Sequence, residues 1–468
     1  MSQPVRIEHD LLGDRTVPAD VYYGIHTLRA LENFSITGTP ISIYPDLVVS
    51  LACVKQAAAI ANAELGLLDE ERSTAIRLAC EAVREGQLHD QFVVDVIQGG
   101  AGTSTNMNAN EVICNRALEE LGRGKGDYAR LHPLDHVNMS QSTNDVYPTA
   151  VKLALQLGIR KLLDEMVFLR GAFEAKAAEF GDVLKVGRTQ LQDAVPMTLG
   201  QEFSTYAVML GEDESRLSEA AGLIREINLG ATAIGTGINA HPDYAPLVTR
   251  RLSEVSGVPF ISAPNLIEAT QDAGSFVQLS GVLKRIAVKL SKTCNDLRLL
   301  SSGPRAGIGE IALPSVQAGS SIMPGKVNPV IPEVVNQIAF EAIGNDITVT
   351  MAAEGGQLQL NAFEPIIAHS LFKSLKHLAA GCRTLGERCV LGITANRERA
   401  RRLLDESTAL VTALTPFIGY ARSTEIAQEA LATGARVYDL VLQRKLMGRQ
   451  ELDRLLSPEM LTKPRSDK

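Results

Sequence analysis

Two long runs of apolar residues at helical spacing constrain the fold of this chain more than any other feature. Their members recur at alternating intervals of four and three positions, which places each run on one side of a long helix. Such helices need apolar partners, and a chain with little strand alternation supplies them by packing helices against one another at shallow angles. The sequence therefore predicts an all-α fold with a bundle of long helices. The runs are Leu155, Ile159, Leu162, Met166, Leu169 and Phe173, and Phe276, Leu279, Leu283, Ile286 and Leu290.

Composition and charge exclude several classes of protein. The 468 residues are 45% hydrophobic and 21% charged, with a formal net charge of -8, as is typical of a soluble globular protein. The acidic balance disfavours nucleic acid as a partner. Residues 1–15 lack the apolar segment of a signal peptide, and Lys284 and Lys289 interrupt the most apolar helical stretch. We therefore expect a cytoplasmic protein with no membrane span.

The cysteines and histidines do not indicate a metal centre. Six cysteines are scattered along the chain without a CxxC pair, so we expect reduced, buried thiols. His132 and His136 stand four positions apart, but Pro133 follows the first directly and no glutamate completes an HExxH motif. We therefore expect no metal-centred mechanism.

Five loops rich in Gly, Pro, Ser, Thr and Asn separate the expected helices, and loops on a rigid scaffold often carry function. A charged region begins near residue 396, and the first very long helix begins near residue 141. We therefore expect an N-terminal domain at 1–141, a central long-helix domain at 142–396 and a small helical domain at 397–468. The loops are residues 99–105, 138–148, 187–196, 230–242 and 301–332.

The most specific segment is residues 318–329, with the sequence AGSSIMPGKVNP. Two glycines and two prolines shape a loop that carries two hydroxyls, a cation and an amide within nine positions. This set of groups is suited to binding a carboxylate and placing an oxygen base beside it. From residue types alone, a surface loop with incidental polarity stays an alternative. The four polar residues are Ser320, Ser321, Lys326 and Asn328.

The pattern GSSxMPxKxNP in this segment resembles the signature of the fumarase and aspartase superfamily. Three further segments, at residues 100–108, 140–145 and 187–194, resemble the substrate-contacting regions of the same superfamily. The likeness runs from about residue 10 to residue 456. It implies three domains, with the central helices of four identical subunits forming a twenty-helix core. It also implies that each active site is built from loops of three subunits of a homotetramer.

The resemblance implies a role for each matching residue. Ser320 matches the catalytic base that removes a proton from the substrate carbon next to the leaving group. Lys326 and Asn328 match residues that bind the substrate α-carboxylate, and Ser321 and Gln190 lie in the substrate-binding segments. The residues around the other carboxylate, which becomes a dianionic enediolate, are Thr103, Ser142, Thr143, Asn144 and Thr189. Taken alone, residues 142–144 also fit a helix cap.

Gln190 is the informative departure within the superfamily. Fumarases carry histidine at this place, paired with a glutamate that resembles Glu333, and glutamine cannot shuttle protons. Loss of hydroxide from malate needs acid assistance, whereas a protonated amino group leaves as neutral ammonia. The sequence therefore favours removal of ammonia from L-aspartate to give fumarate, with no cofactor required. Activation by a divalent cation is left open.

Other readings fit the residues less well. A fumarase is the first alternative, followed by a lyase of an N-substituted aspartate such as argininosuccinate. Ammonia-lyases with a cyclised Ala-Ser-Gly electrophile are disfavoured because that tripeptide is absent. A helical scaffold without turnover, like the lens crystallins related to this superfamily, is disfavoured because Ser320, Lys326 and Asn328 are all present.

Overall fold

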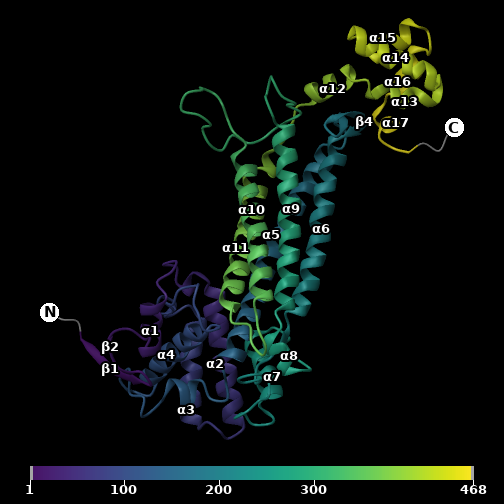
Figure 1. The fold of residues 1–468 in the computed structure, drawn as a ribbon. Coiled ribbons are helices and arrows are strands. Elements are labelled where there is room, and N and C mark those ends of the chain that lie inside the picture. Colours follow the sequence, from purple (N-terminus) through teal and green to yellow (C-terminus); the bar gives the residue numbers. More distant parts are fainter. Residues whose placement is uncertain (1–3, 465–468) are drawn as a thin grey trace. The chain divides into compact units, whose positions relative to one another are not determined.

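The computed structural model describes residues 4–464 and is predominantly helical (Figure 1). Its chain forms two compact units, each assembled from three segments. Unit 1 contains Met1–Leu163, Ser215–Arg285 and Phe340–His377, and unit 2 contains Asp164–Glu214, Ile286–Ala339 and Leu378–Lys468. The expected division into three consecutive domains stays a prediction.

Five long helices within the described residues each contribute to both units. Every member of the two predicted apolar runs is buried, with at most 2% of its surface exposed. The runs therefore form the core sides of α5 and α9, and the predicted all-α class is confirmed. The long helices are α5 (Thr143–Glu179), α6 (Leu199–Leu223), α9 (Gly274–Leu300), α10 (Val330–Glu354) and α11 (Glu364–Arg388).

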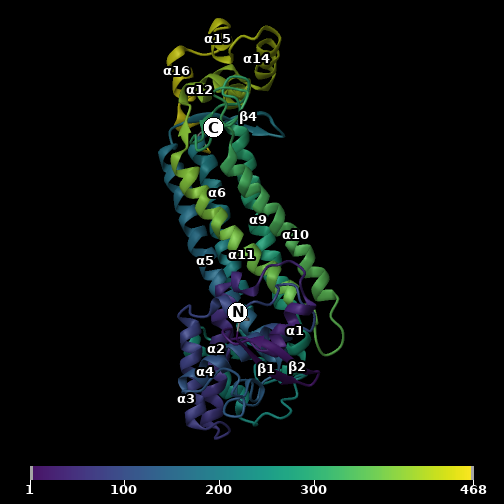
Figure 2. The ribbon, with the colours of Figure 1, turned by 90° about the vertical axis from the view of Figure 1, so that its left-hand side faces the viewer.

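Polar side chains bridge α9 and α10 within each unit. Figures 1 and 2 show the ribbons of these long helices. In unit 1, Asp346 on α10 accepts hydrogen bonds from Ser280 and Lys284 on α9, at 2.8 and 2.6 Å. In unit 2, Asn336 on α10 donates to the Ser291 hydroxyl on α9 at 2.8 Å. These contacts fix which sides of the neighbouring helices face each other, because a buried polar group needs a partner.

Among the described residues, helix α2 (Pro45–Glu64) is the one helix that is long and apolar enough to cross a membrane, judged by length and composition alone. However, 78% of its most apolar window is buried inside the protein, and Lys55 at its centre takes part in a polar network. Because its apolar surface is already covered by protein, α2 is a core helix of unit 1.

Three further helices of unit 1 pack directly against α2, and α1 packs on α4. Helix α2 contacts α3, α4 and α7, and Asp69 caps α3 by accepting the Arg72 backbone N–H at 2.9 Å. Residues Pro133–Val137 form one π-helical turn. The helices are α1 (Ile25–Asn33), α3 (Glu70–Arg84), α4 (Thr103–Glu120), α7 (Tyr244–Ser256) and α8 (Leu266–Gln271).

The structure also contains short strands, which the sequence did not predict because apolar and polar residues alternate little along it. Two antiparallel hairpins, β1–β2 (Val5–Asp10 and Gly13–Pro18) and β3–β4 (Leu184–Thr189 and Gln192–Thr198), occur in the described residues. Two-residue pairs complete the strand content: β5 (Glu226–Ile227) with β6 (Ile261–Ser262), and β7 (Ile311–Ala312) with β8 (Thr394–Ala395).

The C-terminal helices of unit 2 have a core of their own. Leu404, Leu414, Val441 and Leu452 are buried in it, and the β3–β4 hairpin packs against α12 and α13. All six cysteines of the chain are free and buried, as predicted. The helices are α12 (Arg397–Glu406), α13 (Ala409–Ile418), α14 (Tyr420–Thr433), α15 (Val437–Gln443), α16 (Arg449–Leu455) and α17 (Pro458–Leu461).

Candidate active site

The first group of predicted site residues lies at two helix starts in unit 1. Thr103 is the first residue of α4, and its hydroxyl donates to the Gly100 carbonyl at 2.7 Å. Gly102 precedes it with φ of 91°, and a Cβ there would lie 2.4 Å from the Tyr147 ring. Only glycine fits both the left-handed backbone and this close approach. The exposed Thr103 side chain is thereby held at the end of a rigid helix.

Ser142, Thr143 and Asn144 form the start of α5. The Ser142 hydroxyl accepts the Asn144 backbone N–H at 3.2 Å, so the helix-cap interpretation is correct for this residue. Thr143 faces α4, because the Asn106 side chain donates to its hydroxyl at 3.1 Å. The structure thus brings the two helix starts together through Asn106, one turn after Thr103. Asn144 donates its amide to the Ala233 carbonyl at 2.7 Å.

A buried lysine behind these helix starts was missed by the sequence analysis. The Lys55 ammonium donates to Asn106 Oδ1, Asn138 Oδ1 and Gln141 Oε1 at 2.7, 2.9 and 2.9 Å. Three acceptors match the three donors of an ammonium group. Burial lowers the pKa of Lys55 to about 7. The only signal in the sequence is one lysine inside an alanine-rich apolar helix.

Asp145 supports the same region from the other side. Its fully buried carboxylate accepts the backbone N–H groups of Ser142, Gly230 and Thr232 at 3.0, 3.1 and 2.9 Å. Burial raises the pKa of this carboxyl to about 7, against the lowering effect of these hydrogen bonds. The residue ties the start of α5 to the 228–240 loop, so both are held in one arrangement.

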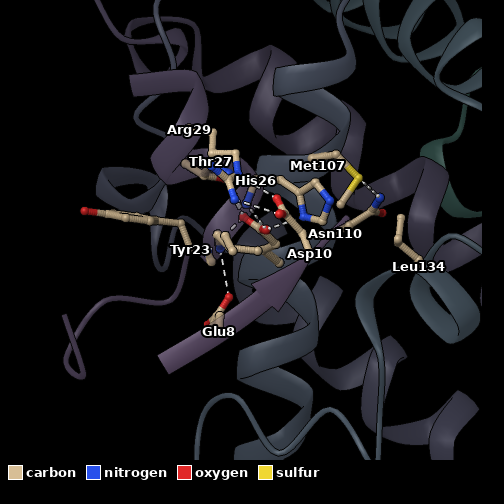
Figure 3. A network of polar contacts seen from close by, with 12 residues as sticks. Glu8, Asp10, Tyr23, His26, Thr27, Arg29, Met107, Asn110 and Leu134 are labelled. Carbon is tan, nitrogen blue, oxygen red and sulfur yellow. Dashed lines mark hydrogen bonds and ion pairs between the residues drawn. The ribbon is translucent and has the colours of Figure 1, made fainter. Parts of the chain in front are cut away.

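A cavity of about 350 Å³ opens beside Thr103 in unit 1. Arg29 on its wall makes a bidentate contact to Asp10, with both distances 2.7 Å, and His26 contacts Glu111 at 3.1 Å (Figure 3). The hydrogen bond with Glu111 raises the pKa of His26. Arg29 and His26 are therefore each paired with a carboxylate, and apolar residues such as Phe34 and Met107 line the rest of the cavity beside Thr103. His26 lies in a stretch that also resembles the superfamily.

The second group of predicted residues lies in unit 2, starting with the β3–β4 hairpin. Thr189 pairs with Gln192, and the two loop residues between them, Gln190 and Leu191, have φ of 54° and 63°. Positive φ at both central positions is the geometry of a tight hairpin turn, which non-glycine residues adopt at a cost of about 1 kcal/mol or more each. Gln190 is thus presented, exposed, at the tip of a rigid hairpin.

Glu310 anchors this hairpin. Its carboxylate is fully buried and lies 3.0 Å from the Arg188 guanidinium and 3.1 Å from the Lys185 ammonium. Arg188 directly precedes Thr189 on β3. A buried carboxylate needs such cations, so the pair of contacts holds the strand that carries Thr189.

The serine loop, residues 318–329, carries the remaining predicted residues. The Ser320 hydroxyl accepts the backbone N–H groups of Ile322 and Met323 at 3.2 and 3.0 Å. Asn328 donates its side chain to the Gly319 carbonyl at 2.9 Å, and the Gly319 N–H donates to the Lys326 carbonyl at 3.0 Å. The loop therefore closes on itself around Ser320, with Ser321 and Lys326 exposed.

Gly319 makes this closure possible. A Cβ on Gly319 would lie 2.2 Å from the Lys326 carbonyl oxygen, so no other residue allows the two backbones to approach. Thr103 and residues 142–144 thus lie in unit 1, where Asn106 connects them, whereas Thr189, Gln190 and the serine loop lie in unit 2. Within residues 4–464, no three His, Cys, Asp or Glu side chains are grouped as metal ligands.

Comparison with known proteins decides the family. Residues 13–344 match the family described as lyase, and residues 410–463 match the family described as fumarase C C-terminus. The chain belongs to the fumarase and aspartase superfamily. The superfamily resemblance predicted from the serine loop is therefore confirmed.

Several members of this superfamily match over nearly their whole length. Aspartate ammonia-lyases of Helicobacter pylori and Pseudomonas aeruginosa are 58% and 60% identical over 464 and 461 residues. The alignments cover 99% of both chains in the first case, and 98% of this chain and 97% of the relative in the second. The aspartate ammonia-lyase of Escherichia coli is 54% identical, with 99% of this chain and 97% of the relative covered.

Solved structures of the superfamily share this fold. A structure described as fumarate lyase:delta crystallin from Brucella melitensis bound to cobalt has a TM-score of 0.96 and 57% identity, covering 98% of this chain and all of the other. A class II fumarase from Schistosoma mansoni has a TM-score of 0.92 and 35% identity, covering 97% and 98%. The fold of this chain is therefore shared with solved structures at 57% and 35% identity.

Proposed function

We propose that this chain is an aspartate ammonia-lyase, which converts L-aspartate to fumarate and ammonia. The observation that carries the proposal is the name shared by relatives 54–60% identical over nearly the full length. The fumarase with 35% identity is a more distant match. The types of residue at the site support the same assignment, because hydroxyls, amides and a lysine suit a dicarboxylate substrate.

Ser320 acts as the base that removes a proton from Cβ of aspartate. A free serine hydroxyl is a poor base, so its alkoxide must be stabilised by neighbouring donors. The backbone N–H groups of Ile322 and Met323 already point at the Ser320 oxygen and would serve as such donors. Lys326 and Asn328 bind the α-carboxylate and hold the substrate beside the base.

The β-carboxylate becomes a dianionic enediolate as the proton leaves. Donors arranged in advance stabilise this charge more in the transition state than in the ground state, and each contributes about 3 kcal/mol by analogy with oxyanion holes. Asn106 donates to the Thr143 hydroxyl and the Asn144 amide donates to the Ala233 carbonyl, and these hydrogen bonds hold both side chains for the proposed role. Thr103, Ser142 and Thr189 complete the proposed set, and we assign Ser321 to substrate binding as well.

Gln190 favours ammonia over water as the leaving group. Its exposed amide at the hairpin tip can donate and accept hydrogen bonds but cannot supply a proton. An ammonium group leaves without further protonation, whereas hydroxide does not. We further propose that the reaction needs no cofactor and takes place in the cytoplasm.

The proposed enzyme is a homotetramer with active sites shared between subunits. The exposed apolar side chains of α10 in the single chain include Phe340, Ile347 and Met351, at 61%, 62% and 64%. They stand seven and four positions apart and so share one side of the helix. A contiguous apolar side of this kind is typical of a surface that an identical subunit covers.

Hybrid tetramers test the sharing of sites. We expect Ser142→Ala and Ser320→Ala proteins to be nearly inactive when assayed separately. If Ser142 and Ser320 of one site come from different chains, subunit exchange creates some sites with neither change, and part of the activity returns. Mixed samples are assayed after exchange has been demonstrated by mass-tagged subunits. No recovery after proven exchange would count against sharing.

The substrate assignment is tested by the ultraviolet absorbance of fumarate. Aspartate, malate and argininosuccinate are added separately to the purified protein. We expect fumarate from aspartate, with ammonia released in equal amount. Faster release from malate would identify a fumarase instead, and faster release from argininosuccinate would identify a lyase of N-substituted aspartates.

A further inference from the structure

A basic cavity in unit 2 lies outside the residues assigned to the reaction. It has a volume of about 390 Å³ and lies between the turn that follows α9 and the start of α12. Its six lining residues include three arginines and one carboxylate. The chain as a whole carries a net charge of -8, so this surplus of positive charge runs against the general balance. The lining residues are Pro304, Arg305, Asn396, Glu398, Arg399 and Arg402.

The arginines retain hydrogen-bonding capacity. Within residues 4–464, Arg305 has no hydrogen-bond or ion-pair partner. Arg402 has its nearest carboxylate, Glu406, at 4.0 Å, which is too long for a hydrogen bond. Arg399 uses two nitrogens to hold the carbonyls of Ile308 and Gly307, both at 3.0 Å. A guanidinium has five N–H donors, so most of those in the cavity are available to a ligand.

The start of α12 adds to the preference for an anion. This ten-residue helix begins at the cavity, and Asn396 caps it by accepting the Arg399 N–H at 3.2 Å. The first amide groups of a helix and its dipole favour negative charge nearby. The guanidinium groups and the N–H groups at the start of α12 can together donate hydrogen bonds to the oxygens of a phosphoryl group.

We propose that this cavity binds a small phosphorylated metabolite through its phosphoryl group. The lining contains no aromatic ring on which a nucleobase would stack, which favours a compact ligand over a nucleotide. The shared chemistry of the two sources, a phosphate ester and free phosphate, is the dianionic phosphoryl group. The proposal does not depend on the identity of the substrate of the lyase reaction.

Binding at this place would act on the segment that leads to the serine loop. Arg399 already joins α12 to residues 307 and 308, and the next residues contain Glu310, which anchors the β3–β4 hairpin. A ligand held by Arg305 and Arg402 together would add a second link between this turn and α12. The site is therefore placed to stiffen the base of the serine loop.

Calorimetric titrations test the proposal on the full-length protein. Orthophosphate and glycerol 3-phosphate are the probes, with chloride added to hold ionic strength constant. We expect saturable binding that weakens about tenfold or more in Arg305→Ala and in Arg402→Ala, because each removes charge-assisted hydrogen bonds. Arg401→Ala is the matched control, since Arg401 lies on the same helix but pairs with Asp405 at 2.9 Å and does not line the cavity.

The outcomes separate the alternatives. Tighter binding of glycerol 3-phosphate than of orthophosphate would identify an ester as the occupant, and equal binding would identify free phosphate. Absence of saturable binding, or equal weakening in Arg401→Ala, would overturn the proposal. Binding must also persist in Lys326→Ala, because loss there would assign the phosphate to the active site instead. Circular dichroism confirms that each variant is folded.

Discussion

Replacing Ser320 with alanine is expected to lower kcat about a thousandfold while aspartate still binds. General base catalysis contributes roughly 10²–10⁴ in rate, and alanine removes the base without removing Lys326 or Asn328. The Ser320 hydroxyl accepts two backbone N–H groups and donates to no residue within the described residues 4–464, so its loss leaves the loop closure at Gly319 intact. The change should therefore act on the transition state.

Initial rates and calorimetry separate rate from binding in this variant. Ser315→Ala is the matched control, because Ser315 is an exposed serine on the same connection before α10, and its kcat should stay within about twofold of the original. If Ser320→Ala kept more than a tenth of the original kcat, a loss below ~1.4 kcal/mol, Ser320 would not be the essential base.

The helical architecture was accessible from sequence because it depends on a local repeat. The runs from Leu155 to Phe173 and from Phe276 to Leu290 have the period of a helix, and burying one side of each satisfies most of their contacts. The strand at Leu184–Thr189 was not predicted, since its stability comes from pairing with Gln192–Thr198 and from packing against α12 and α13. Such contacts leave no periodic signal in the chain.

The site was predictable only in part for a related reason. Motif likeness singled out Ser320, Thr103 and Gln190 as candidates, but the buried charged groups that support the neighbouring segments come from distant positions. Lys55 donates hydrogen bonds to Asn106 and Gln141, which are 51 and 86 positions away, and the sequence around Lys55 does not predict these partners. Likewise, Glu310 reaches Arg188 across 122 positions. Supporting polar contacts of this kind follow from the folded topology and not from local pattern.

In each unit, buried charged residues hold a segment that carries candidate site residues. In unit 1, buried Lys55 and Asp145 hold two helix starts from behind, and in unit 2 buried Glu310 holds the hairpin strand. Both arrangements place charge where water is excluded, which costs stability unless every partner is present. Preorganised donors at the site require this rigidity, because donors that reorient during the reaction lose most of their effect.

Replacement of Lys55 by methionine is therefore expected to lower the free energy of unfolding by about 3 kcal/mol. Methionine fills about the same volume, but Asn106, Asn138 and Gln141 lose the ammonium that their side-chain oxygens share, and Asp145 loses a positive charge that lowers its pKa. Activity should fall as well, because Asn106 would no longer be fixed where it donates to Thr143.

Urea unfolding at one fixed protein concentration measures this change, since the stability of an oligomer depends on concentration. Lys161→Met is the matched control. Its ammonium lies 2.8 Å from Asp46 on the surface, with 65% of the lysine side chain exposed, and such pairs contribute at most about 1 kcal/mol. We expect the Lys55 variant to unfold at clearly lower urea with an unchanged slope, and the Lys161 variant to match the original protein. If the two variants were equally stable, the free energy lost by burying the ammonium would equal the free energy gained from its three hydrogen bonds. The role of Lys55 would then be to orient Asn106 and not to stabilise the fold.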